Sequence, residues 1–117
     1  MSMVPKQRGP FPKRKRYENE AYRRYVASQP CMACGYHETQ AAHISVGNFA
    51  RGMKADDYYC IPLCGLHMTA TSNGLFSCHV LFDQNQKRFA RKYLGKSIEE
   101  LKAEAKASWQ QWLSEAA

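Results

Sequence analysis

The chain has 117 residues, of which 44% are hydrophobic, and it carries a formal net charge of +7 at pH 7. This length predicts one small domain, near the size at which a bound metal usefully supplements a modest hydrophobic core. The longest apolar runs are too short to span a bilayer and no hydrophobic signal segment is evident, so we expect a cytoplasmic protein with no membrane partner. In that compartment, five cysteines favour metal ligation over a disulfide framework.

The first 16 residues form a basic segment. They carry six basic side chains and no acid, so residues 17–117 have a net charge of only +1. Prolines and a glycine disfavour regular helix there, which predicts an extended arm (1–16) ahead of a single domain (17–117). Such an arm can bind phosphates without sequence preference, or it can be a solubilising tail. Its candidate nucleic-acid-binding residues are Lys6, Arg8, Lys13, Arg14, Lys15 and Arg16.

Apolar side chains recur at helical spacing after the arm. Tyr17, Tyr22 and Val26 fit one face of an amphipathic helix over residues 18–28, and Pro30 would end it. The spacing marks a buried stripe, so we expect these tyrosines to be core residues rather than surfaces on which bases stack.

Two close-spaced pairs of metal-ligand residues follow, Cys31-x-x-Cys34 and Cys64-x-x-His67. Each pair can supply two ligands from one tight turn, and zinc prefers thiolate and imidazole ligands in a tetrahedral arrangement. The spacing therefore predicts a structural zinc site made by Cys31, Cys34, Cys64 and His67. Cys78 and His79 form a rival source of ligands.

Residues 41–44 and 58–63 lie between the two pairs and predict two strands, joined by a loop that contains glycine. Lys54 in this loop could contact a phosphate or be an ordinary exposed lysine. We expect Asp57 to serve as a turn or cap residue. Cys60 alternates with the apolar residues of its strand, which predicts a thiol in the core.

Three helices are predicted after the second pair. The first covers residues 65–72 and is broken by Asn73-Gly74. The second covers residues 83–94 and closes at Gly95. The third begins with a capping box at Ser97, and its apolar face should pack on the domain.

This order of a cysteine pair, a strand ending near His43, a loop, a second strand and Pro62-Leu63-Cys64-x-x-His67 resembles the zinc-containing HNH (ββα-metal) nucleases of phages and prophages, of the recombination-associated type. The resemblance covers residues 30–113. It implies an α+β fold, a small zinc-stabilised HNH-like domain with flanking helices. In that family two antiparallel strands and a helix hold a catalytic divalent metal, here Mg²⁺ or Mn²⁺, and His43 would activate water against a DNA phosphodiester.

The chain departs from the family at three positions that usually hold ligands of the catalytic metal. They are occupied by Ala42, Met68 and Ser72. Alanine has no donor atom, a thioether is a soft ligand, and a neutral hydroxyl binds a hard cation weakly. We therefore expect the zinc scaffold to be kept and the catalytic metal site to be eroded, unless His79 approaches His43 as a substitute ligand.

Three functions follow from these patterns. The first is a zinc-stabilised, HNH-like phage or mobile-element protein that engages DNA, or a host or phage DNA-processing protein, without catalysis. The alternative is an active metal-dependent DNA endonuclease with His43 as its general base. A treble-clef-like zinc domain without a nucleic-acid role is disfavoured by the basic arm. The choice depends on the site and not on the fold.

Overall fold

The computed structural model describes residues 16–46, 55–65, 68–71 and 74–116. The basic side chains at positions 6–15, Lys54, His67 and Ser72 lie outside the described residues. The elements follow one another along the chain in the order α1 (Glu20–Ala27), β1 (Thr39–His43), η2 (Asp57–Tyr59), β2 (Cys60–Cys64), β3 (Met68–Thr71), β4 (Gly74–Ser77), α2 (Cys78–Gln84), α3 (Gln86–Phe89), η3 (Ala90–Leu94) and α4 (Ile98–Ala116).

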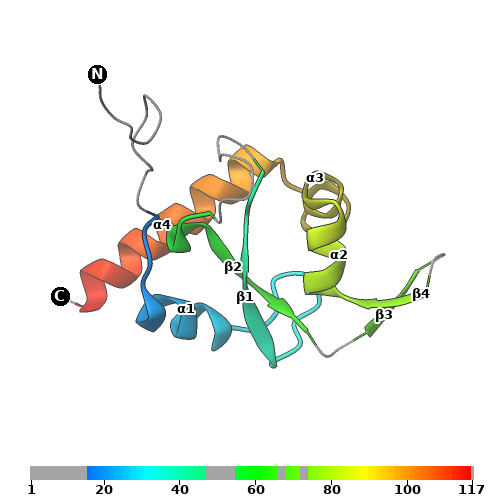
Figure 1. The fold of residues 1–117 in the computed structure, drawn as a ribbon, viewed down its shortest axis with the longest axis horizontal. Coiled ribbons are helices and arrows are strands. Elements are labelled where there is room, and N and C mark those ends of the chain that lie inside the picture. The colour runs from blue at the N-terminus through cyan, green and yellow to red at the C-terminus, as the bar shows by residue number, and fades with distance from the viewer. Residues whose placement is uncertain (1–15, 47–54, 66–67, 72–73, 117) are drawn as a thin grey trace, which may run out of the picture.

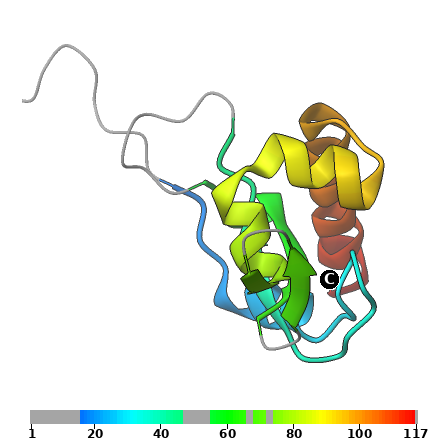
Figure 2. The same ribbon diagram turned by 90° about the vertical axis from the view of Figure 1, so that its right-hand side faces the viewer.

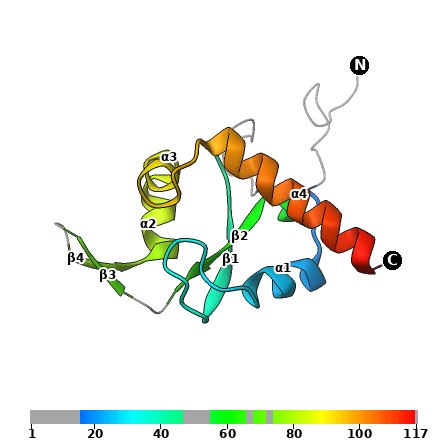
Figure 3. The ribbon, with the colours of Figure 1, turned by 180° about the vertical axis from the view of Figure 1, so that it is seen from behind.

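The helix predicted after the arm is confirmed as α1. Asn19 caps it, because its side chain accepts a hydrogen bond from the Tyr22 N–H at 3.0 Å. Tyr22 and Val26 are buried, and Trp112 of α4 packs against them. Helices α1 and α4 therefore lie side by side on one face of the domain (Figure 3).

Strands β1 and β2 form a two-stranded antiparallel sheet at the centre of the domain, with His43 opposite Cys60 and Thr39 opposite Cys64 (Figure 1). Successive side chains on a strand point to opposite faces. Ala42 faces the main core, which also contains Leu63, Phe82 and Leu101. The odd-numbered residues of β1, including His43, face the side of the sheet that α1 covers.

The prediction of a helix over residues 65–72 is wrong. Met68–Thr71 is strand β3, which pairs with β4 in an antiparallel hairpin, with Thr71 opposite Gly74. Two β-branched threonines favour a strand, and asparagine and glycine are typical turn residues. Asn73-Gly74 is therefore better interpreted as a hairpin signal than as a helix breaker. The hairpin stands at one end of the molecule, away from α4 (Figure 1).

The helix predicted over residues 83–94 begins earlier than expected, at Cys78, and is interrupted once. Ser77 caps α2, and the extended backbone of Asn85 separates α2 from α3. The two helices consequently meet at an angle (Figure 2). The predicted end is confirmed, because Gly95 adopts a left-handed conformation with φ of 66° directly after η3.

The capping box that opens α4 is confirmed. The Glu100 N–H donates to Ser97 Oγ at 3.1 Å, and the Ser97 N–H donates to Glu100 Oε1 at 2.9 Å. Leu101 and Ala105 of α4 are buried in the main core. The chain thus folds as a small compact α+β domain, as predicted. Among the described helices, none has the length and apolarity needed to cross a bilayer.

Candidate functional site

Four cysteine thiols converge between the central sheet and α2. The Sγ atoms of Cys31, Cys34, Cys64 and Cys78 all lie within 4.8 Å of one another. In a tetrahedral zinc site with zinc–sulfur bonds of about 2.3 Å, the sulfur atoms are separated by about 3.8 Å. The distance between the Sγ atoms of Cys34 and Cys64 is 3.6 Å. The arrangement therefore fits a tetrahedral metal ion, and no disulfide links these cysteines.

The cluster is positioned by three separate parts of the chain. Cys31 and Cys34 lie in a tight turn, where the Gly35 N–H donates to the Cys31 carbonyl at 2.8 Å and Gly35 takes a φ of 79°. The Met32 N–H donates to the Pro62 carbonyl at 2.9 Å, which fixes the turn to β2. Cys64 ends β2, and Cys78 begins α2. A metal here would join the turn, the sheet and α2.

The thiols differ in their acidity. Burial raises the pKa of Cys31, but backbone hydrogen bonds from Cys34, Cys64 and Ala33 outweigh it and bring the pKa to about 7. Burial raises the pKa of Cys78, and the neighbouring sulfur of Cys64 raises it further. Crowded thiolates repel one another, and a bound cation relieves that repulsion, so metal binding and thiol deprotonation reinforce each other.

The structure brings together three of the four predicted zinc ligands, and it adds Cys78. His67 lies outside the described residues. Two signals in the sequence pointed to Cys78. The Asn73-Gly74 hairpin signal predicts that the chain turns back soon after Cys64. Ser77 is a cap residue that places Cys78 in the first turn of a helix.

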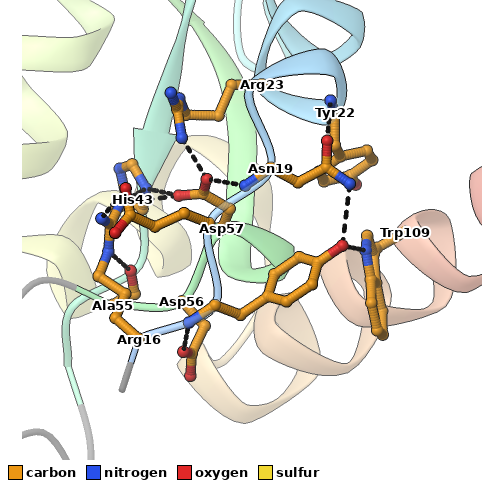
Figure 4. A network of polar contacts seen from close by, with 11 residues as sticks. Arg16, Asn19, Tyr22, Arg23, His43, Ala55, Asp56, Asp57 and Trp109 are labelled. Atoms are coloured by element: carbon orange, nitrogen blue, oxygen red, sulfur yellow. Dashed lines mark hydrogen bonds and ion pairs between the residues drawn. The ribbon is translucent and has the colours of Figure 1, made fainter.

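A second polar cluster surrounds His43, the predicted general base, at the end of β1 (Figure 4). His43 Nε2 lies 2.9 Å from Asp57 Oδ1, and Arg16 Nη2 donates to the same oxygen at 2.8 Å. The other carboxylate oxygen, Oδ2, accepts from the Asn19 N–H at 2.7 Å and from the Arg23 guanidinium. Asp57 is therefore the centre of a network that joins the N-terminal segment, α1, β1 and η2.

The Asp57 carboxylate is fully buried, and it is held as an anion. Burial raises its pKa, but hydrogen bonds from His43, from the Asn19 N–H and from Arg23 outweigh burial and hold the pKa below its ordinary value. An ionised carboxylate can only accept a hydrogen bond, so the 2.9 Å contact requires His43 Nε2 to carry a proton and to donate to Asp57 Oδ1. In the neutral ring Nδ1 then carries the lone pair.

The His43 cluster does not fit a catalytic divalent metal. His43, Asp57 and Cys60 are close enough to share an ion. However, both carboxylate oxygens of Asp57 accept bonds from arginines, and burial raises the pKa of Cys60 to about 12, so this thiol is not a ready ligand. Ala42, which the resemblance to HNH nucleases places at a ligand position, is fully buried and offers no donor. Cys60 is thus a core thiol, as predicted.

His79 does not approach His43. Its Nδ1 lies 2.7 Å from Gln40 Oε1, and its Nε2 lies 3.5 Å from Asp83 Oδ2. Gln40 is three residues from His43 on β1, a separation of about 10 Å, and the two side chains point to opposite faces of the sheet. The expected rescue of a catalytic metal site by His79 is therefore not supported by the described residues.

The structure also revises the interpretation of two residues near the arm. Arg16, predicted to bind nucleic acid, directs its guanidinium inward, where it also donates from Nε to the Ala55 carbonyl at 2.8 Å. Asp57, predicted as a turn or cap residue, does begin η2, but its carboxylate is the centre of the network. The sequence contained no signal for this pairing, because Arg23 is 34 residues away from Asp57.

A family model described as "Protein of unknown function (DUF968)" matches residues 5–108 of the chain. The chain is also 41% identical over 58 residues to the "Uncharacterized protein YdfU" of Escherichia coli (strain K12). The matched segment makes up 49% of this chain and 17% of the relative, so the chain covers less than a fifth of that relative's length. No solved structure gives a significant match. Because the family model covers most of the sequence, including the four clustered cysteines and His43, the chain belongs to the DUF968 family.

Proposed function

We propose that the chain is a zinc-stabilised, HNH-like domain that engages DNA without cleaving it. The zinc assignment is supported by the four clustered thiols, whose separation suits a tetrahedral ion with sulfur ligands. The HNH assignment is supported by the order of the elements. A cysteine turn precedes an antiparallel strand pair with a histidine at the end of its first strand, and a helix packs on that pair.

The observation that carries DNA engagement is the point at which the basic segment enters the described domain. Residues 1–15 contain five basic side chains and no acid, and they lead directly into Arg16. Arg16 is anchored on Asp57 and reaches His43, so the segment joins the domain at the histidine cluster. A run of cations fixed at one end to a folded domain suits the regular negative charge of a phosphate backbone. The same charge would also suit an acidic DNA-processing protein, which is the alternative partner.

The absence of cleavage is supported by the ion pairs that the Asp57 carboxylate already makes. Two guanidinium groups already neutralise this carboxylate, and Ala42 has no ligand atom. A hard divalent cation needs several oxygen ligands. The described residues around His43 offer no such set.

A truncation tests the proposal. A chain that begins at Arg16 should keep its fold, because the bond between Arg16 and Asp57 is retained. Its affinity for duplex DNA should fall, and the log–log salt slope should decrease by about 0.9 for each phosphate that the basic segment no longer neutralises. The matched control replaces Lys87 and Arg88, two exposed basic residues of α3, with glutamine. Fluorescence anisotropy at several salt concentrations gives both quantities. If the intact chain binds no DNA, or if the truncated chain binds with the same affinity and slope, the proposal is wrong.

One observation favours the nuclease alternative. The Nε2–H of His43 is held by a buried carboxylate, and this leaves Nδ1 as the lone-pair nitrogen that a general base needs. Incubation of the intact chain with plasmid DNA and Mg²⁺ or Mn²⁺ distinguishes the two functions. We expect no cleavage. Cleavage that disappears in His43→Ala, but persists in the control His37→Ala at an exposed position, would establish the nuclease instead.

A further inference from the structure

Aromatic rings gather where η2 meets α4. Tyr58 lies 4.9 Å from Trp109 between ring centroids, and Tyr17 lies 5.6 Å from Tyr58 and 5.2 Å from Trp109. Tyr59 packs edge-on against Tyr58 at 4.7 Å. We call these four rings the η2–α4 aromatic surface. All four residues are only half-buried, so part of the surface reaches solvent.

Two lysines of α4 cover ring faces of this surface. Lys106 Nζ lies 5.2 Å from the centroid of Tyr58, and Lys102 Nζ lies 5.1 Å from the centroid of Tyr59. The two lysines are four residues apart, so they occupy the same face of the helix one turn apart. Lys106 is exposed, so its long, flexible side chain can move off the ring without disturbing the core, whereas Lys102 Nζ also donates to the Val46 carbonyl at 3.2 Å. Lys106 therefore marks the ring face that a ligand could reach more readily.

This combination differs from the other aromatic contacts of the described domain. Both tryptophans pack against the cluster that contains Tyr22, but Trp112 meets Tyr22 and Tyr25 between two helices, and no described lysine lies over those rings. Lys92 lies over Tyr93, but those two are neighbours in sequence and the ring lacks a second lysine partner. Within the described residues, the η2–α4 surface combines four rings in tilted or edge-on contact with two cations on one helix face.

The surface also includes the residue that directly follows Arg16 in the sequence. This residue is Tyr17, and Arg16 is the residue at which the segment joins the domain. Trp109 Nε1 donates to the Tyr17 hydroxyl at 3.1 Å, which fixes this junction to α4 (Figure 4). A strand of nucleic acid that follows the basic residues would therefore be led onto the aromatic rings.

We propose that the η2–α4 aromatic surface binds unpaired bases of single-stranded DNA, with Lys102 and Lys106 contacting the adjoining phosphates. This inference rests on the proposed DNA engagement and names its preferred form. Every base has a π-face, so aromatic rings beside a row of cations bind single strands with little sequence preference. Bases in an intact duplex are already stacked on one another and could not occupy the rings.

The test compares a thymidine oligonucleotide of about 12 residues, a length suited to one stacking surface, with a duplex of the same length. The variant Lys102→Gln/Lys106→Gln should bind the single strand more weakly and lower the salt slope by about 0.7 for each lysine that contacts a phosphate. The control Lys87→Gln/Arg88→Gln removes the same charge from exposed positions of α3 and should change neither quantity. Tyr58→Leu, which keeps apolar packing, should weaken single-strand binding about 5- to 100-fold.

Tryptophan fluorescence reports on the surface directly, because the chain has two tryptophans. In Trp112→Phe the remaining Trp109, beside Tyr58, should be quenched by the oligonucleotide. In Trp109→Phe the remaining Trp112, which packs between α1 and α4, should not respond. Binding of both DNA forms by the intact chain, with equal small effects of the lysine and control variants and no quenching of Trp109, would overturn this inference and leave DNA engagement standing. Binding of neither form would overturn both.

Discussion

Arg16 and Asp57 are 41 residues apart in the sequence, yet Arg16 Nη2 donates to Asp57 Oδ1 at 2.8 Å. The acceptor is fully buried, and the donor side chain is 19% exposed. The folded domain therefore includes Arg16. Any experiment on the basic segment must leave this residue in place, because its removal would leave part of a buried charge without a partner.

Asp57→Asn should destabilise the domain. The substitution removes the charge that two arginines and His43 converge on, while it keeps the size of the side chain. We expect a loss of about 2–4 kcal/mol in the free energy of unfolding, because removing hydrogen bonds to a buried charge costs more than removing hydrogen bonds between neutral groups. Urea unfolding followed by circular dichroism measures it. Asp83→Asn, at an exposed position of α2, is the matched control and should change little. Equal effects of the two substitutions would show that the network contributes no stability.

The free energy of unfolding should depend on pH through the ionisation of the Asp57 carboxylate. The pKa of Asp57 is lowered in the folded state, so its contribution is fully present above the pKa of the unfolded chain, about 4. The contribution is lost as the pH falls through the lower pKa of the folded state. The difference in unfolding free energy between the natural chain and Asp57→Asn should thus be constant near neutral pH and shrink in acid. A difference that grows as the pH falls would contradict the assignment.

The proposed zinc site can be tested by separating its two candidate fourth ligands, Cys78 and His67. Cys78→Ser should lose zinc and unfold, because a structural zinc site contributes on the order of 10 kcal/mol of binding energy that is also folding energy. His67→Ala should keep about one zinc per chain if four cysteines complete the site. Cys60→Ala removes a buried thiol outside the cluster and controls for the loss of packing. Elemental analysis after gel filtration gives the zinc content. Zinc retained in Cys78→Ser and lost in His67→Ala would restore the ligand set predicted from the sequence.

The sequence predicted those parts of the fold that depend on local signals. The cap at Ser97, the left-handed residue at Gly95 and the apolar stripe of α1 are each encoded within a few residues, and each was confirmed. The cysteine turn was predicted for the same reason. Cys31 and Cys34 are three residues apart, and the geometry of such a turn leaves little choice.

The parts that could not be predicted depend on contacts between distant residues. No periodicity indicates that Arg23 would meet Asp57, and a charged pair of this kind is otherwise expected to be solvated. Cys78 was missed as a main candidate for a different reason. The sequence was expected to form a helix over residues 65–72, whereas Met68–Thr71 is strand β3, and the hairpin it forms with β4 returns the chain to the other three thiols at Cys78. The pairing of β3 with β4 could not be predicted from a helical period, and His67, which lies outside the described residues, stays a predicted ligand.

A final prediction concerns Ala42, which the proposed HNH resemblance aligns with a position that usually carries a metal ligand. Ala42 is fully buried in the main core, on the opposite face of β1 from His43. Ala42→His should therefore fail to create a catalytic site. It should instead lower the free energy of unfolding by about 1–3 kcal/mol, because a larger side chain overpacks the core. Ser45→His, at an exposed position just beyond β1, is the control and should leave stability nearly unchanged. Urea unfolding measures the first effect, and plasmid cleavage with Mg²⁺ measures the second. A stable Ala42→His variant that cleaves DNA would show that one missing ligand, and not the closed network around Asp57, is what keeps the natural chain from cutting.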